Sequence, residues 1–231
     1  MDKTILILGG SGKLGKEVTK SLNKIKCNFI APTHTECDIT NFNSLENIIK
    51  LEKPNIIFHS AGLIDTEKCE TDRQLCLDVN VIGTYNIIKC CRKYNIRLVF
   101  MSSEYVFSGE EEKYSCNSAI NPKNTYGLSK GCGELMVKTL DDYLIIRSPF
   151  IRSVTFPYEF AFNDQFTSRQ YVHQIVDDII DYIFSSKRGI YHIVGKYQSV
   201  YELALETNSN VKPISTPEKL REVLPMKLNL I

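Results

Sequence analysis

The stretch that decides the fold is Gly9-Gly10-Ser11-Gly12-Lys13-Leu14-Gly15. It follows a short apolar run, Thr4–Leu8, and opens a segment with the apolar spacing of a helix, Lys13–Ile25. Glycines between a buried strand and a helix allow a tight turn and let the backbone approach an anion at the helix N-terminus. The stretch therefore predicts a turn that binds the pyrophosphate of a dinucleotide.

Two glycine frames fit this turn. Gly9, Gly12 and Gly15 fit GxxGxxG, and the last two also fit GxGxxG with Gly10. A Walker A loop is excluded because Leu14 stands where that motif needs serine or threonine. A glycine turn that only packs a helix onto a strand is the alternative, and the strand–turn–helix context favours dinucleotide binding.

Strand and helix signals alternate along the next part of the chain. The expected strands are Cys27–Ala31, Asn55–His59, Arg97–Met101 and Tyr143–Arg147. The expected helices are one that Thr40 caps and that reaches Leu51, then Arg73–Tyr94 and Tyr126–Leu140. Such alternation predicts parallel βαβ units with helices on both faces of the sheet.

The regularity weakens after Pro149. We expect a loop over Ile151–Gln170, a helix over Val172–Phe184, a strand over Gly189–Val194, a short helix over Ser199–Glu206 and an irregular tail. No internal repeat is visible. The prediction is an α/β fold with a doubly wound parallel sheet, of Rossmann type, over residues 1–231. Residues of about 150–170 and 195–231 should form a small, reduced substrate-side lobe.

The composition excludes several classes of protein. Twenty-eight basic and 27 acidic residues nearly cancel, so no global field would attract nucleic acid or an anionic membrane. The apolar runs are too short for a signal peptide or a membrane span. Eight scattered cysteines are expected to be free thiols in the cytoplasm, and their spacing gives no zinc motif and no other metal site.

A hydroxyl, a phenol and an amine stand where such a fold would gather them. Ser103 follows the strand Arg97–Met101, and Tyr126 and Lys130 share one face of the next helix. An ordinary tyrosine has a pKa near 10, and a lysine ammonium beside it, together with an oxidised nicotinamide ring, would favour the phenolate. A shift of about three units corresponds to about 4 kcal/mol. Each residue alone has a structural explanation, but together they predict nicotinamide-dependent carbonyl chemistry.

The end of the second expected strand bears on the choice of dinucleotide. NAD-binding proteins place an acidic residue there, on the ribose diol. Here no carboxylate occurs until Glu36. We therefore favour NADP(H) over NAD(H), with Thr33, His34 or Lys13 near the extra phosphate.

Several motifs resemble one family, the dTDP-4-dehydrorhamnose reductases, which are extended short-chain dehydrogenases/reductases. Ser102-Ser103-Glu104-Tyr105-Val106-Phe107-Ser108-Gly109 resembles its S-T-D-Y-V-F-x-G. The segment from Pro122 to Glu134 is similar to its P-x-N-x-Y-G-x-x-K-x-x-G-E. Asn163-Asp164-Gln165-Phe166 matches its N-D-Q-x-G, with Thr167 in place of glycine, and Gly189–Ile193 matches G-x-Y-H-x. The resemblance covers roughly residues 4 to 205.

The resemblance implies a role for each catalytic residue. Tyr126 would donate a proton to the C4 carbonyl oxygen of a sugar while nicotinamide delivers hydride to the carbon. Lys130 would tune Tyr126 and hold the nicotinamide ribose, and Ser103 would bond the carbonyl oxygen.

The resemblance also implies the residues that bind cofactor and substrate. Asp38 and Ile39 would contact adenine, Ser60 to Gly62 would line the phosphates and ribose, and Asn80 would bend its helix. The complete cofactor set is Gly9, Gly12, Lys13, Leu14, Gly15, Thr33, His34, Asp38, Ile39, Ser60, Ala61, Gly62, Asn80, Tyr126 and Lys130. The substrate set is Glu104, Tyr105, Asn163 and Gln165.

Two departures from the family keep alternatives open. The connection from Arg147 to Asn163 is brief where the family usually has another helix, and the C-terminal part is cut down. The first hypothesis is an NAD(P)H-dependent reductase of a nucleotide-activated 4-keto-6-deoxy sugar. One alternative is a non-catalytic nucleotide-binding regulatory subunit, similar to the β subunit of methionine adenosyltransferase. Another is a nucleotide-sugar epimerase or dehydratase. A homodimer or a partner enzyme is possible in each case.

Overall fold

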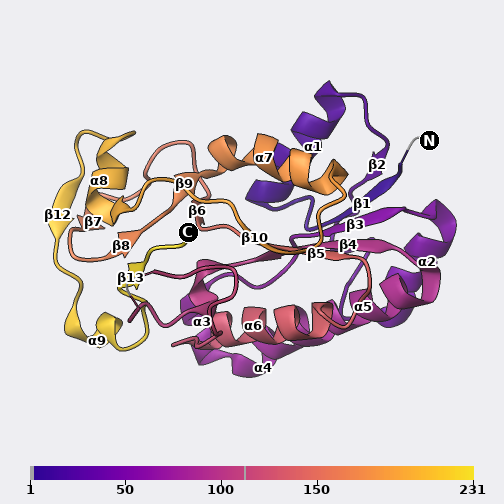
Figure 1. The fold of residues 1–231 in the computed structure, drawn as a ribbon, viewed down its shortest axis with the longest axis horizontal. Coiled ribbons are helices and arrows are strands. Elements are labelled where there is room, and N and C mark those ends of the chain that lie inside the picture. The colour runs from indigo at the N-terminus through magenta and orange to yellow at the C-terminus, as the bar shows by residue number, and fades with distance from the viewer. Residues whose placement is uncertain (1–2, 112) are drawn as a thin grey trace.

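Six parallel strands form the central sheet of the protein, which a computed structural model describes over residues 3–111 and 113–231. Their order is β10-β5-β4-β3-β1-β2 (Figure 1). The strands are β1 (Ile5–Leu8), β2 (Phe29–Ile30), β3 (Ile56–His59), β4 (Arg97–Ser102), β5 (Tyr143–Arg147) and β10 (Gly189–His192). The chain winds outward from β1 in both directions, so the order reverses between β1 and β3. Ligands bind at such a reversal in doubly wound sheets.

Helices cover both faces of this sheet (Figure 1). One layer holds α1 (Lys13–Lys24) and α7 (Val172–Phe184); the other holds α2 (Phe42–Glu52), α5 (Gly83–Tyr94) and α6 (Thr125–Val137). In β1, Ile5 and Ile7 pack into the core under α1 and α7, whereas Leu6 and Leu8 pack into the core on the other face. Successive side chains of a strand point to opposite faces, so a continuous apolar run marks a strand that is covered twice. The predicted fold class is confirmed.

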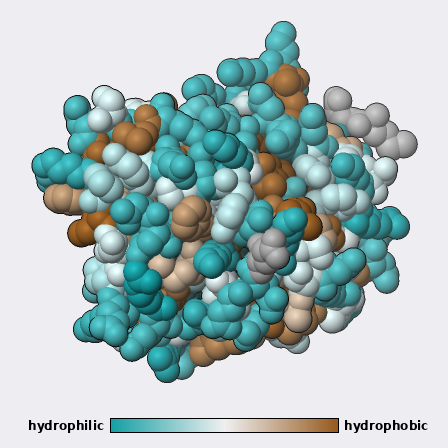
Figure 2. Space-filling model, turned by 60° about the vertical axis from the view of Figure 1, so that its left-hand side comes forward, coloured by the Kyte–Doolittle hydropathy of each residue, from teal (hydrophilic) through white to brown (hydrophobic). Residues whose placement is uncertain are grey.

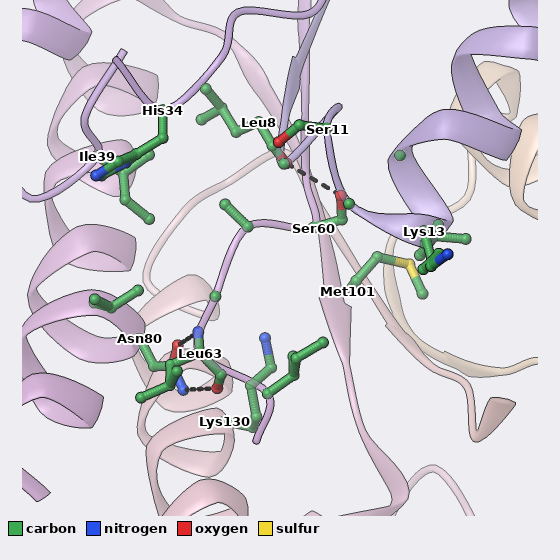
Figure 3. Close-up of a pocket in the computed structure, with 18 of the residues that line it drawn as sticks. Leu8, Ser11, Lys13, His34, Ile39, Ser60, Leu63, Asn80, Met101 and Lys130 are labelled. Carbon is green, nitrogen blue, oxygen red and sulfur yellow. Dashed lines mark hydrogen bonds between the residues drawn. The ribbon is translucent and has the colours of Figure 1, made fainter. Parts of the chain in front are cut away.

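The long helix predicted over Arg73–Tyr94 is interrupted. The chain forms α3 (Thr66–Thr71), α4 (Arg73–Leu77), a π-helical turn at Asp78–Ile82, and only then α5. The Asn80 amide accepts a 2.7 Å hydrogen bond from the Leu63 N–H and donates a 2.9 Å bond to the Leu63 carbonyl (Figure 3). It also donates to the Ser129 hydroxyl. Asn80 therefore lies in the distorted turn, as a helix-bending residue should.

The predicted cap of α2 is wrong by one residue. Asn41 is the N-cap, and its side chain accepts hydrogen bonds from the N–H groups of Asn43 and Ser44. The Thr40 hydroxyl instead donates to the Asp38 carboxylate at 2.8 Å. Both residue types suit a cap, and the adjacent carboxylate decides between them.

The segments expected to be irregular contain short strands and a helix. The C-terminal lobe consists of β6 (Phe150–Ile151), β7 (Phe160–Phe162), β8 (Phe166–Thr167), β9 (Gln170–Tyr171), β11 (Gln198–Ser199), α8 (Val200–Leu205), β12 (Lys212–Ile214), α9 (Glu218–Arg221) and β13 (Lys227–Leu228). β8 lies between β11 and β13, and β7 pairs with β12. The loop predicted for Ile151–Gln170 and the irregular tail are therefore wrong in part. Strands this short, paired with distant segments, carry no local periodicity.

Two small apolar clusters hold the C-terminal lobe. One gathers Phe156, Ala161, Val200, Ala204 and Val211 within it. The other packs Leu228 and Leu230 against Val106, Phe107 and Tyr114, which follow β4. The lobe is thereby attached next to the strand end that carries Ser103. Whether it is the substrate-side part of the protein stays a prediction.

The outer surface is mostly hydrophilic on the face shown in Figure 2, with smaller hydrophobic areas between the polar side chains. None of the helices in residues 3–111 and 113–231 has the length and apolarity needed to cross a membrane.

Candidate active site

The glycine turn approaches the neighbouring strand so closely that a side chain is excluded. Gly9 has a φ of +93°, and a Cβ there would lie 2.5 Å from the Ala61 nitrogen. The Gly12 N–H donates to the Gly9 carbonyl at 3.0 Å, and α1 starts directly afterwards without a side-chain cap. The first N–H groups of α1 are therefore available to an anion, as pyrophosphate binding requires.

A cavity of about 390 Å³ lies over this turn at the carboxyl ends of the strands (Figure 3). Every predicted cofactor residue except Thr33 lines it. These residues are Gly9, Gly12, Lys13, Leu14, Gly15, His34, Asp38, Ile39, Ser60, Ala61, Gly62, Asn80, Tyr126 and Lys130. The Thr33 N–H and hydroxyl instead donate to the Glu36 carboxylate at 2.7 and 2.8 Å. The glycine turn and the Tyr126–Lys130 helix thus face one space.

The start of α6 holds Tyr126 against the segment that follows β4. Asn124 caps the helix by accepting a 2.8 Å hydrogen bond from the Gly127 N–H. A Cβ at Gly127 would collide with the Tyr105 carbonyl oxygen, so only glycine allows this close packing. The Ser103 hydroxyl lies near enough to the Tyr126 phenol to lower its pKa. The serine and the phenol that the sequence predicted are therefore brought together.

Burial raises the pKa of Tyr126 to about 12, against the opposing effects of the Ser103 hydroxyl and of the Arg152 charge. The sequence predicted a lowered pKa, for a site with Lys130 beside the phenol and an oxidised nicotinamide. In the protein alone, loss of hydration outweighs the favourable contacts. At neutral pH the phenol therefore carries its proton.

Lys130 lies in the buried wall of the cavity, with its Nζ 4.1 Å from the centre of the Phe100 ring. Burial lowers the pKa of this amine to about 8, and the nearby Glu134 carboxylate opposes the shift. Glu134 itself accepts hydrogen bonds from Arg147 at 2.9 and 2.7 Å and from Ser102 at 2.5 Å. Lys130 is therefore a desolvated cation whose pKa lies close to neutrality.

Glu104 is held in a polar cluster behind the phenol. It is 2% exposed, and its two oxygens accept from the Arg169 Nε at 2.6 Å and the Thr167 hydroxyl at 2.9 Å. Arg169 also donates to the Tyr105 hydroxyl at 3.2 Å, and the Tyr105 ring meets Tyr126 edge-on at 5.9 Å. The predicted substrate contacts of Glu104 and Tyr105 remain untested, while their structural roles are plain.

Asn163 and Gln165 lie in the C-terminal lobe, and neither residue lines the cavity. Gln165 is buried and its amide donates to the Pro225 carbonyl at 3.0 Å. Asn163 is exposed, and its backbone N–H donates to the Ile214 carbonyl. Their substrate contacts stay a prediction.

Several residues of the cavity lining were missed by the sequence reasoning. Among them are Met101 near the end of β4, Phe150 in β6 and Arg152 just after it. Met101 follows from the rule that strand ends line the site. Phe150 and Arg152 lie in a segment expected to be a loop, where no motif marked them. Within the described ranges, no group of three or more His, Cys, Asp or Glu side chains could hold a metal ion.

Comparison with known sequences identifies a matching family and several individual relatives. A family model described as the RmlD substrate binding domain matches residues 3–155. Spore coat polysaccharide biosynthesis protein SpsK of Bacillus subtilis is 27% identical over 205 residues, which are 82% of this chain and 72% of that protein. The dTDP-4-dehydrorhamnose reductase of Aggregatibacter actinomycetemcomitans is 32% identical over 144 residues, 62% of this chain. That match spans only about half (49%) of the reductase.

Solved structures agree with this grouping. A dTDP-4-dehydrorhamnose reductase from Bacillus anthracis in complex with NADP superposes with a TM-score of 0.90 at 27% identity. The match covers 100% of this chain and 90% of that chain. A UDP-glucose 4-epimerase from Thermus thermophilus, 17% identical with a TM-score of 0.77, shares the fold alone. Since the family model covers most of the chain and its motifs are present, the protein belongs to the RmlD family, in the dTDP-4-dehydrorhamnose reductase group of short-chain dehydrogenases/reductases.

Proposed function

We propose that the protein is an NAD(P)H-dependent reductase of a nucleotide-activated 4-keto-6-deoxy sugar. The observation that carries this proposal is the placement of Tyr126 and Lys130 in the wall of the cavity over the glycine turn, with Ser103 near the phenol. A dinucleotide on the turn would supply hydride, and a carbonyl above the phenol would receive the proton. The names of the reductase relatives support the same substrate class.

Each residue has a distinct part in this reaction. Tyr126 donates its phenolic proton to the carbonyl oxygen, and the raised pKa of Tyr126 keeps that proton available at neutral pH. The Ser103 hydroxyl donates a hydrogen bond to the same oxygen as charge develops on it. The Lys130 ammonium stabilises the phenolate that remains.

We propose NADP(H) as the preferred dinucleotide. His34 and Lys13 line the cavity and carry the donors that an extra phosphate would need. Glu36, the first carboxylate after β2, is already bonded to Thr33, which keeps it from a ribose diol. The relative from Bacillus anthracis was solved with NADP.

The surroundings of Glu104 favour a reductase over a dehydratase. A dehydratase needs acid and base groups that exchange protons beside the substrate. Both oxygens of Glu104 accept hydrogen bonds from Arg169 and Thr167, and Glu104 does not line the cavity. A regulatory subunit would have no need of Tyr126 and Lys130 in one cavity wall with Ser103 near the phenol.

The cytoplasm is the proposed setting, supported by the absence of any disulfide among the eight cysteines.

The test is NADPH oxidation with a panel of nucleotide-linked 4-keto-6-deoxy sugars. Turnover should collapse in Tyr126→Phe and persist in Tyr85→Phe, which alters an exposed tyrosine on α5. Full turnover in Tyr126→Phe would overturn the mechanism. Tight NADPH binding without turnover of any sugar would support the regulatory alternative.

A further inference from the structure

Arg152 is a cation of the cavity without a hydrogen-bond or ion-pair partner in the part of the chain that the structure describes. It follows β6, which pairs with β9, and it lines the same cavity as Tyr126 and Lys130. Its side chain is exposed, and among the described residues it has no hydrogen bond or ion pair. The neighbouring arginines differ, because Arg147 is bonded to Glu134 and Arg169 to Glu104. The Arg152 guanidinium is therefore free to take an anion from solution.

The anion that Arg152 would bind is not the pyrophosphate at the glycine turn, because that turn has its own hydrogen-bond donors. The first N–H groups of α1, which no side chain caps, would bind the pyrophosphate of a dinucleotide there. Arg152 lies on the Tyr126 side, since its charge acts on the phenol and opposes the rise in the pKa of Tyr126. It comes from the junction with the C-terminal lobe and not from the strands that carry the turn. A second anionic group, close to the reacting carbonyl, would suit it.

We propose that Arg152 binds the diphosphate of the nucleotide-activated sugar. This inference rests on the proposed function, in which the C4 carbonyl of the sugar lies at Tyr126. A pyranose ring carries its diphosphate on C1, so the diphosphate must lie one ring width from the phenol. The planar fork of a guanidinium matches two phosphate oxygens, and binding there orients the ring as well as holding it.

The test separates binding of the diphosphate from binding of the cofactor. Protein saturated with NADP is titrated with thymidine diphosphate by calorimetry, in the wild type, Arg152→Met and Arg152→Lys. Arg188→Met is the control, because Arg188 is an exposed arginine outside the cavity lining. We expect Arg152→Met to weaken the binding of thymidine diphosphate by at least about tenfold. Arg188→Met should leave this affinity unchanged. Arg152→Lys should fall between them, since it keeps the charge and loses the fork.

Kinetics supply the second readout. Arg152→Met should raise KM for the keto sugar while kcat and the affinity for NADPH stay within about twofold of the wild type. Equal affinity for thymidine diphosphate in wild type and Arg152→Met would overturn the inference while leaving the reductase intact. An equal loss of NADPH affinity would also overturn it, because Arg152 would then serve the cofactor. Binding of thymidine diphosphate that depends on Arg152, without turnover of any keto sugar, would support the anion site and overturn the reductase.

Discussion

Arg169 donates a 2.6 Å hydrogen bond to Glu104 and so joins the C-terminal lobe to the strand end beside the catalytic phenol. The acid is 2% exposed and the side chain of the arginine 19% exposed. Because Arg169 also bonds Tyr105, whose ring touches Tyr126, the pair connects the packing of the lobe to the catalytic tyrosine. An acid buried this deeply needs its hydrogen-bonding partner.

Arg169→Met should therefore destabilise the protein. Removing one partner of a buried pair leaves the other charge unpaired, at a cost of about 3 kcal/mol in the free energy of unfolding. Urea denaturation measures this, and the Arg169→Met/Glu104→Gln double variant should recover part of the loss because it removes the unpaired charge. A single variant as stable as the wild type would show that the pair contributes nothing.

The pH dependence of reduction should reflect Lys130. The pKa of Lys130 is lowered to about 8 by burial, so the amine is charged below pH 8 and neutral above it. We expect kcat/KM to fall as pH rises through about 8, since the phenolate loses its cation. The Tyr126 proton is retained over this range because the pKa of Tyr126 is about 12. A profile in Lys130→Met that keeps the same inflection near pH 8 would assign it to another group.

Gly9→Ala should abolish dinucleotide binding, and Gly189→Ala should not. Both glycines have a positive φ, of +93° and +94°, so each substitution costs about 1 kcal/mol of backbone strain. Only at Gly9 would the new Cβ meet the Ala61 backbone, while nothing lies within 4 Å at Gly189. Fluorescence titration with NADPH compares the two. Equal binding by both variants would contradict the role of this turn.

His34→Ala should reduce the preference for NADPH over NADH. A donor near the extra phosphate contributes to one cofactor and not to the other, so the ratio of the two dissociation constants should fall by about threefold to tenfold. Thr33→Ala is the matched control, because Thr33 contacts Glu36 and does not line the cavity. Equal weakening of both cofactors in His34→Ala would place His34 elsewhere on the nucleotide.

The sheet was predictable because its strands are covered on both faces. Runs such as Tyr143–Arg147 are apolar almost throughout, and the glycine turn marks where the first strand ends and the first helix begins. The helix Val172–Phe184 matches the structure in both bounds, since a broad apolar stripe faces α1. Local patterns carried this much of the fold.

The rest depends on contacts between distant residues. β8 is two residues long and is defined by its neighbours β11 and β13, which no periodicity of its own could indicate. Arg169 and Arg152 belong to no motif, and their different fates, one paired with Glu104 and the other unpaired among the described residues, appear only in three dimensions. The N-cap of α2 is Asn41 and not the predicted Thr40, because the Thr40 hydroxyl donates its hydrogen bond to Asp38.

The position of β8 between β11 and β13 also determines the order in which the two sheets can form during folding. The central sheet is whole once β10 (Gly189–His192) has joined β5, whereas the sheet around β8 waits for β13 (Lys227–Leu228). Contacts between remote segments form slowly because a long loop must be closed first. During synthesis the six-stranded sheet can thus assemble while β8 still lacks β13 as a neighbour.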